Sequence, residues 1–288
     1  DAELVITSTD TLLGLVTPMN AKVTQLDVAI DFSLYPQEPP TRTDGSADRV
    51  RMGFAGSTNR SRDFAELMAV VLDALDAHPQ LELEVIGPRS AVPSHPRITV
   101  FPYLHSHAAY VTFQTQRAWD IGLAPLTVTA SNQYKTDVKY REYAAQYIAG
   151  IYQDAAPYSR VVDGVTGLLA STPEQWRAAI DRLVTDRDLR ESVRLAARAD
   201  AEQRYAPGPV ADRWLRALEV SEVVRAPRTP QQTVDVRAFL AQPVPWTVRT
   251  GWRLRLLVAY GRTMVEQHGW AHTIGRAVRF ARKKVLGR

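Results

Sequence analysis

Residues 120–154 read DIGLAPLTVTASNQYKTDVKYREYAAQYIAGIYQD, and this stretch decides the fold. It contains two short apolar runs of the kind that form buried strands, Ile121 to Ala124 and Ile148 to Tyr152. Between them lie a polar loop and an amphipathic segment, Val138 to Tyr147, that predicts a helix. Strand, helix and strand in this order are typical of a parallel sheet covered by helices.

The same alternation continues on both sides of this stretch. Further strands are predicted at Leu4 to Thr7, Leu26 to Ile30, Val50 to Ala55, Leu83 to Ile86 and Ile98 to Phe101. Further helices are predicted at Asp63 to Ala77, Ala108 to Ala118, Pro173 to Val184, Leu189 to Tyr205 and Pro209 to Val224. We place Arg190, Arg194 and Arg198 on the outer face of their helix. The pattern predicts an α/β protein with a doubly wound, Rossmann-like parallel sheet, in which ligands bind at the carboxyl ends of the strands.

Two linkers divide the chain. YPQEPPTRTDGSAD (Tyr35 to Asp48) and RAPRTPQQT (Arg225 to Thr233) are rich in proline and polar residues and have no periodicity. We therefore expect three parts, residues 1–46, 47–224 and 225–288, the last a helical C-terminal extension. Because the chain enters an apolar run within five residues of Asp1, we expect it to be a fragment of a longer protein.

The composition bounds the class of protein. The chain has 288 residues, 45% of them hydrophobic, which is enough for a packed core. It has no apolar run near 18 residues and no signal peptide at its start, so we expect a cytoplasmic protein, soluble or peripheral to a membrane. The absence of cysteine fits a reducing compartment and excludes a thiolate metal site or a cysteine nucleophile.

The positive charge is concentrated at the C-terminal end. Residues 241–288 hold ten basic residues and one acid, a net charge of +9, so the rest of the chain carries −5 of the total of +4. Aromatic and aliphatic residues alternate with arginines over 246–288, which suits a helix on the anionic inner face of a membrane. Packing against another domain or subunit is the alternative. Nucleic-acid binding has no other support, so we expect none.

The segment GFAGSTNRSRDF (Gly53 to Phe64) follows a predicted strand and opens a helix. Gly56 permits close backbone approach to a ligand, and Arg60 and Arg62 add charge suited to a diphosphate. The segment matches neither the dinucleotide-binding pattern nor the P-loop pattern. The alternative is a glycine turn with solvated arginines.

A second candidate lies in NQYKTDVKYREYAA (Asn132 to Ala145). Lys139 and Glu142 are three residues apart and share a helix face, near Lys135. A lysine beside a carboxylate at the end of a parallel strand can bind a phosphate and a ribose diol together. An ordinary surface salt bridge is the alternative.

The order of these segments carries a resemblance. The following segments occur in order from Gly53 to Leu169: a strand ending in glycine, a basic turn, ELEVIGP (Glu82 to Pro88), DIGLAPL, K-x-x-E-Y-A-A and P-Y-x-x-V-V-x-D-G-x-T-G-L-L. This series resembles the C-terminal donor-binding domain of family-4-like GT-B glycosyltransferases (glycosyl transferases group 1), over about Gly53 to Tyr205. LVITSTDTLLGLV followed by LDVAIDFSLYP resembles the last strand-helix-strand of their N-terminal domain.

The resemblance implies a function. A nucleoside-diphosphate sugar would be the donor and a glycan or lipid-linked molecule the acceptor, in a retaining transfer that needs no metal and no cofactor. Such a reaction serves polysaccharide or cell-envelope glycan assembly. The alternatives are a non-catalytic donor-binding or scaffold module and a nucleotide-sugar epimerase of the same fold.

The resemblance also implies roles for single residues. Arg62 and Lys139 would be catalytic, because cations stabilise the leaving diphosphate. The donor-binding residues would be Gly56, Arg60, Asn132, Lys135 and Glu142, with Glu142 on the ribose hydroxyls.

The chain departs from the family pattern at three places. Ser57 stands where an arginine is common, and Tyr134 where a glutamate precedes the ribose carboxylate by eight residues. Branches with the pattern N-x-x-K-x-x-x-K-x-x-E-Y also lack that glutamate, and the chain matches them. Ile148 and Ala149 stand in a stretch where the family usually has G-x-P.

Three further signals have ordinary explanations. Asp186-Arg187-Asp188 imitates a metal-binding D-x-D motif, but its position predicts a helix cap. His105 and His107 fit an exposed loop, with contact to a nucleotide base as the alternative. His268 and His272 lack a third ligand, so we expect no zinc there.

Overall fold

The computed structural model describes residues 4–42, 45, 48–57, 60–87 and 89–218. The chain divides into two units, Asp1–Val223 and Val224–Arg288. The second unit, with the predicted basic tail, lies outside the described residues, as do His268 and His272. No helix in the described part is both long and apolar enough to cross a membrane.

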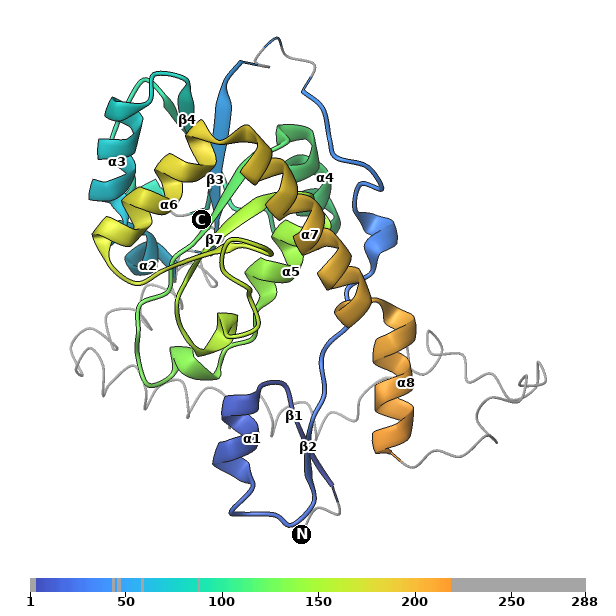
Figure 1. Cartoon of the computed structure of the whole chain (residues 1–288). Helices are drawn as coiled ribbons and strands as arrows, with labels where there is room; N and C mark the ends of the chain where they lie inside the picture. Colours follow the sequence, from blue (N-terminus) through green and yellow to red (C-terminus); the bar gives the residue numbers. More distant parts are fainter. Residues whose placement is uncertain (1–3, 43–44, 46–47, 58–59, 88, 219–288) are drawn as a thin grey trace, which may run out of the picture. The chain divides into compact units, whose positions relative to one another are not determined.

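A parallel sheet forms the centre of the first unit (Figure 1). Its strands are β3 (Val50–Ala55), β4 (Leu81–Ile86), β5 (Ile98–Phe101), β6 (Ile121–Ala124), β7 (Ala149–Gln153) and β8 (Leu168–Ala170). Their spatial order is β5-β4-β3-β6-β7-β8, and every neighbouring pair is parallel. The predicted α/β, doubly wound fold is therefore confirmed. The chain moves outward from β3 to β5 and then returns to the other side of β3, so the order reverses between β3 and β6, where such sheets bind ligands.

Helices cover both faces of this sheet (Figure 1). On one face lie α2 (Ser61–Ala65), α3 (Met68–Ala77) and α6 (Pro173–Thr185), whose buried side chains join those of the strands in one cluster. On the other lie α4 (His107–Arg117) and α5 (Val138–Ala145). Helix α7 (Arg187–Tyr205) contributes buried side chains to the clusters of both faces, and α8 (Pro207–Ala217) follows. The second face is rich in aromatic side chains, with Trp119, Tyr140 and Tyr143 almost fully buried.

Glycines let these aromatic rings pack directly on the strands. A Cβ on Gly122 of β6 would lie 2.6 Å from the ring of Tyr143, and one on Gly53 of β3 would lie 2.0 Å from Trp119. Real side chains do not approach so closely, so only glycine fits. Tyr143 belongs to α5, and its hydroxyl donates to the carbonyl of Leu123 at 2.8 Å. The helix that carries Lys139 and Glu142 is thus anchored to β6.

The N-terminal segment forms a strand-helix-strand unit. It consists of β1 (Val5–Thr7), α1 (Asp10–Val16) and β2 (Val23–Gln25), and the two strands are parallel. The prediction of a strand at Leu26 to Ile30 is wrong, because the strand ends at Gln25. The backbone after it bonds elsewhere: the carbonyl of Val28 accepts from Arg141, and the amide of Ile30 donates to the carbonyl of Tyr205.

Other predicted boundaries also differ. The helix predicted over Asp63 to Ala77 is two helices, separated at Glu66 and Leu67. Strand β8 was not predicted, since it has only three residues and follows a glycine turn. It completes the sheet beside β7.

The placement of Arg190 and Arg198 on an outer helix face is wrong. Arg198 is 3% exposed, donates to the carbonyls of Pro36 and Ala145, and packs against the rings of Phe32 and Tyr147. Arg190 is buried too and donates to backbone carbonyls at the end of α6. Both guanidinium groups donate to backbone carbonyls, and that of Arg198 also pairs with Glu202 at 2.7 Å.

Candidate functional site

Two glycines bring the ends of β3 and β4 together at the carboxyl edge of the sheet. Gly87 follows β4 with a φ of 116°, a conformation that residues with a Cβ rarely adopt. A Cβ there would lie 1.9 Å from the carbonyl oxygen of Gly56. The amide of Gly56 in turn donates to the carbonyl of Ile86 at 3.0 Å. The turn after β3 is therefore fixed against its neighbour by backbone contacts.

Beside this turn lies a cavity of about 300 Å³. Four parts of the chain contribute to it: the turn after β3, the end of β4, the segment from the end of β5 into α4, and α5. The lining residues are Ala55, Gly56, Ser57, Arg60, Ile86, Tyr103, Leu104, His105, His107, Tyr110, Lys139 and Glu142. Three residues predicted to bind the donor, Gly56, Arg60 and Glu142, thus line one cavity with Lys139, which was predicted to be catalytic.

An ion pair forms the α5 side of this cavity. Lys139 Nζ lies 2.7 Å from Glu142 Oε2, and the side chains are 23% and 13% exposed. The hydroxyl of Tyr110, from α4, lies 3.4 Å from each of these two atoms. The ammonium also lies 5.5 Å from the ring centroid of Tyr110 and 5.7 Å from that of Tyr143. A carboxylate, a hydroxyl and two aromatic rings therefore surround the lysine.

The surroundings of Lys139 and Tyr110 determine the protonation states of these two side chains. Burial has the largest single effect and would lower the pKa of Lys139, but the charge and hydrogen bond of Glu142, together with the neighbouring tyrosines, raise the pKa above its ordinary value. Burial, and then the charge of Glu142, raise the pKa of the Tyr110 hydroxyl well above its usual range. At neutral pH the lysine is therefore a cation and the tyrosine a hydrogen-bond donor.

Arg60 brings a second cation to the cavity. Its guanidinium lies 2.7 Å from Asp63 Oδ2, and the other oxygen of Asp63 accepts from the amide of Thr127 at 3.0 Å. Burial alone would raise the pKa of Asp63, but the hydrogen bonds from Thr127 and Arg60 lower it. Burial, and then the charge of Arg60, lower the pKa of Lys135. The negative charge of Asp63, which pairs with Arg60, opposes this lowering.

The remaining predicted residues lie elsewhere. The side chain of Arg62 is 79% exposed and pairs with Glu66 at 3.2 Å, and it does not line the cavity. Asn132 donates its amide to the carbonyl of Thr127 at 2.7 Å and so shapes the loop after β6. Lys135 lines a second cavity. The roles predicted for Arg62, Asn132 and Lys135 stay predictions.

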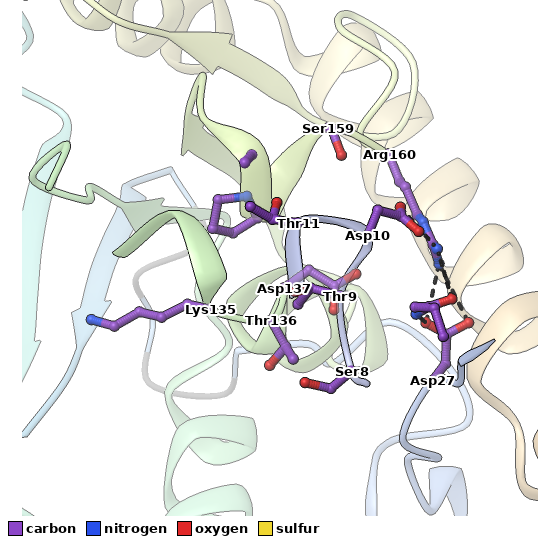
Figure 2. A pocket seen from close by; sticks show the side chains of 13 residues that line it. Ser8, Thr9, Asp10, Thr11, Asp27, Lys135, Thr136, Asp137, Ser159 and Arg160 are labelled. Carbon is purple, nitrogen blue, oxygen red and sulfur yellow. Dashed lines mark hydrogen bonds and ion pairs between the residues drawn. The ribbon is translucent and has the colours of Figure 1, made fainter. Parts of the chain in front are cut away.

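The second cavity, of about 110 Å³, is lined mainly by polar residues of two segments: the β1–α1–β2 unit and the loops around α5 and β7. Arg160 lies at one side of it, 3.3 Å from an oxygen of Asp10 and 3.1 Å from one of Asp27 (Figure 2). Lys135 extends away from this ion-pair cluster. Lys135 thus adjoins the second cavity and is electrostatically coupled to Arg60 in the first.

Sequence reasoning missed Tyr110 as a site residue. A tyrosine on an amphipathic helix is more often a core residue, and nothing local links it to Lys139, 29 positions away. His105 and His107 are exposed, as predicted, and they also line the first cavity. His107 Nε2 lies 3.4 Å from the hydroxyl of Tyr35.

The departure from the family pattern at Ile148 and Ala149 lies directly after an unusual backbone turn. The turn between α5 and β7 needs a left-handed residue, and Tyr147 takes it with a φ of 56°. The Tyr147 side chain offsets the strain of this backbone conformation, since its hydroxyl donates to the carbonyl of Gln37 at 2.8 Å.

Asp186 caps α7 by accepting from the amide of Leu189 at 2.8 Å, which confirms the predicted cap. No group of three or more potential metal ligands occurs among the residues described.

Comparison with solved structures places the fold. HepE from Anabaena, in complex with UDP and glucose, matches with a TM-score of 0.60 at 14% identity, over 76% of this chain and 63% of that one. A glycosyltransferase from Rickettsia africae matches with a TM-score of 0.58 at 12% identity, over 76% and 64%. Sucrose-phosphate synthase from Thermosynechococcus elongatus matches with a TM-score of 0.54 at 13% identity, over 78% and 58%.

The chain has the GT-B glycosyltransferase fold. This confirms the fold that the resemblance implied. At these identities the likeness concerns the fold alone, and no protein-family profile or curated protein sequence matches the chain. The chain spans less than two thirds of the length of these GT-B structures.

Proposed function

We propose that the cavity beside Gly56 binds the nucleoside diphosphate of a sugar donor. The observation that carries this proposal is the Lys139–Glu142 pair, held at the carboxyl edge of the sheet and facing the same cavity as Gly56 and Arg60. Arg60 and Lys139 supply positive charge for a diphosphate, and Glu142 supplies an acceptor for ribose hydroxyls. Three solved structures of HepE, which shares the fold, contain UDP or UDP-glucose.

The whole protein would be a glycosyltransferase that moves the sugar to a glycan or lipid-linked acceptor. As the bond between sugar and diphosphate breaks, negative charge grows on the leaving diphosphate. The ammonium of Lys139 and the guanidinium of Arg60 would stabilise that charge in place. Lys135, and Arg62 after a change of rotamer, would extend this cluster of cations. We infer a retaining transfer without a metal ion or cofactor, in glycan or cell-envelope assembly.

Calorimetric titration tests the donor site. Wild type, Lys139→Ala and Glu142→Gln are titrated with UDP, ADP and GDP. We expect one of these nucleotides to bind wild type, and each variant to bind it at least about tenfold more weakly, since a hydrogen bond to a charged group contributes about 1.5–3 kcal/mol. Lys22→Ala, which removes an exposed lysine outside the cavity, is the matched control and should bind like wild type. Unchanged affinity in both variants contradicts the proposal.

The basic segment 246–288 is a separate proposal. Its charge and aromatic residues support binding to the anionic inner face of a membrane. Vesicles containing phosphatidylglycerol should sediment the chain, and neutral phosphatidylcholine vesicles should not. Equal sedimentation with both, or with neither, contradicts membrane binding through this segment.

A further inference from the structure

The carboxylate of Glu142 is bound on one side only. Lys139 Nζ and the Tyr110 hydroxyl both contact Oε2, at 2.7 Å and 3.4 Å. Within the described part of the chain, Oε1 receives no hydrogen bond. A carboxylate has room for about four hydrogen bonds, so one oxygen is held by the protein and the other is left for a ligand.

Tyr110 helps to hold Oε2 of Glu142, while Oε1 receives no hydrogen bond from the described residues. Its hydroxyl can accept from Lys139 and donate to Glu142 at the same time, which closes a triangle of three side chains. It comes from α4, whereas Lys139 and Glu142 come from α5. Within α5 alone, the lysine and the glutamate could rotate together as an ordinary surface pair. A contact from a second helix removes that freedom.

The neighbouring contacts hold Tyr110 itself. One helical turn further along α4, Gln114 is fully buried and its Oε1 accepts from Gln146 at 2.6 Å. Gln146 ends α5 and is 1% exposed. Buried polar contacts therefore join the two helices next to Tyr110, and such contacts fix a relative position more strictly than apolar packing does. Tyr110 does not depend on a mobile loop for its position.

We propose that Tyr110 is a positioning residue that orients the Glu142 carboxylate so that Oε1 accepts from the vicinal hydroxyls of the donor's ribose. This inference rests on the proposed function. It predicts a specific loss: without the hydroxyl, recognition of the ribose weakens, whereas recognition of the diphosphate changes little, because Lys139 keeps its charge and its 2.7 Å contact with Glu142. A general structural role would weaken both.

The test compares three ligands on Tyr110→Phe and wild type: UDP, 2′,3′-dideoxyuridine diphosphate and inorganic pyrophosphate. We expect the variant to bind UDP about fivefold more weakly, less than the roughly tenfold expected for a short hydrogen bond to a charged group, because the contact is long. Its affinity for the other two ligands should stay within about twofold of wild type. Tyr147→Phe, which loses a hydroxyl hydrogen bond outside the cavity, is the matched control and should bind all three like wild type.

A double-mutant cycle gives a second, independent measurement. In a Glu142→Gln background, Tyr110→Phe should cost no further UDP affinity, because the group it orients is already altered. Equal loss for all three ligands, no loss for UDP, or full additivity in the cycle overturns the inference. If wild type binds none of UDP, ADP and GDP, the proposed function is overturned instead.

Discussion

Gly87→Ala probes the backbone contact that shapes the cavity beside Gly56. Gly87 combines a φ of 116° with a virtual Cβ 1.9 Å from the carbonyl oxygen of Gly56. The unfavourable φ alone costs about 1–2 kcal/mol for a residue with a Cβ. Forcing a methyl group against a backbone oxygen adds about 1–3 kcal/mol, as for overpacked cores. We therefore expect the free energy of unfolding to fall by about 2–5 kcal/mol.

Gly164→Ala is the matched control. Gly164 also has a positive φ, of 74°, but a Cβ there would have no neighbour within 4 Å. It should lose only the φ cost of about 1–2 kcal/mol. Urea unfolding followed by tryptophan fluorescence gives both values, and the difference between them reports the contact with Gly56 together with the difference in φ cost between 116° and 74°. Equal losses in the two variants would refute the claim that the ends of β3 and β4 are locked together.

Three further predictions follow from the described contacts. Arg198→Met keeps the apolar stem but leaves buried carbonyls unpaired, so urea unfolding should show a free energy of unfolding lower by about 2–3 kcal/mol. The control Arg187→Ala, at an exposed position, should change this free energy by less than about 0.5 kcal/mol. Similar values for the two variants would contradict the buried placement of Arg198. The folded-state pKa of Asp63 lies below its ordinary value of 3.8, so the carboxylate stabilises the fold above that pH and loses this effect as the pH falls through the folded pKa. Below about pH 4, the free energy of unfolding of wild type should therefore fall more steeply with pH than that of Asp63→Asn. Equal slopes of unfolding free energy against pH would refute this. In calorimetry, Arg60→Ala should weaken UDP binding about tenfold and Arg62→Ala less than about twofold, because of these two arginines only Arg60 lines the cavity. A larger loss for Arg62→Ala than for Arg60→Ala would show that Arg62 rotates into the cavity.

The sheet could be predicted from the sequence because its buried strands are short apolar runs between amphipathic helices. The sequence could not show where strand β2 lies, since Val23–Gln25 has no apolar pattern and, among the described residues, pairs with β1 alone. Arginines were the other source of error. Arg198 follows Arg190 and Arg194 at helical spacing, which is typical of a solvated face, yet the carbonyls that bind it come from distant segments.

The candidate site was predictable where its residues share one helix. Lys139 and Glu142 are three positions apart, so helical geometry alone brings them together. Arg60 and Arg62 are two positions apart, and their different environments depend on α2 beginning at Ser61. Tyr110 could not be predicted, because its role depends on the packing of α4 against α5.

A crystal structure of the chain with UDP tests the central claim most directly. The quantity to measure is the distance between Glu142 Oε1 and the ribose hydroxyl oxygens. We predict hydrogen-bond distances of about 2.6–3.2 Å, with the diphosphate against Arg60 and Lys139. UDP bound with its ribose away from Glu142, or outside the cavity beside Gly56, would contradict the account.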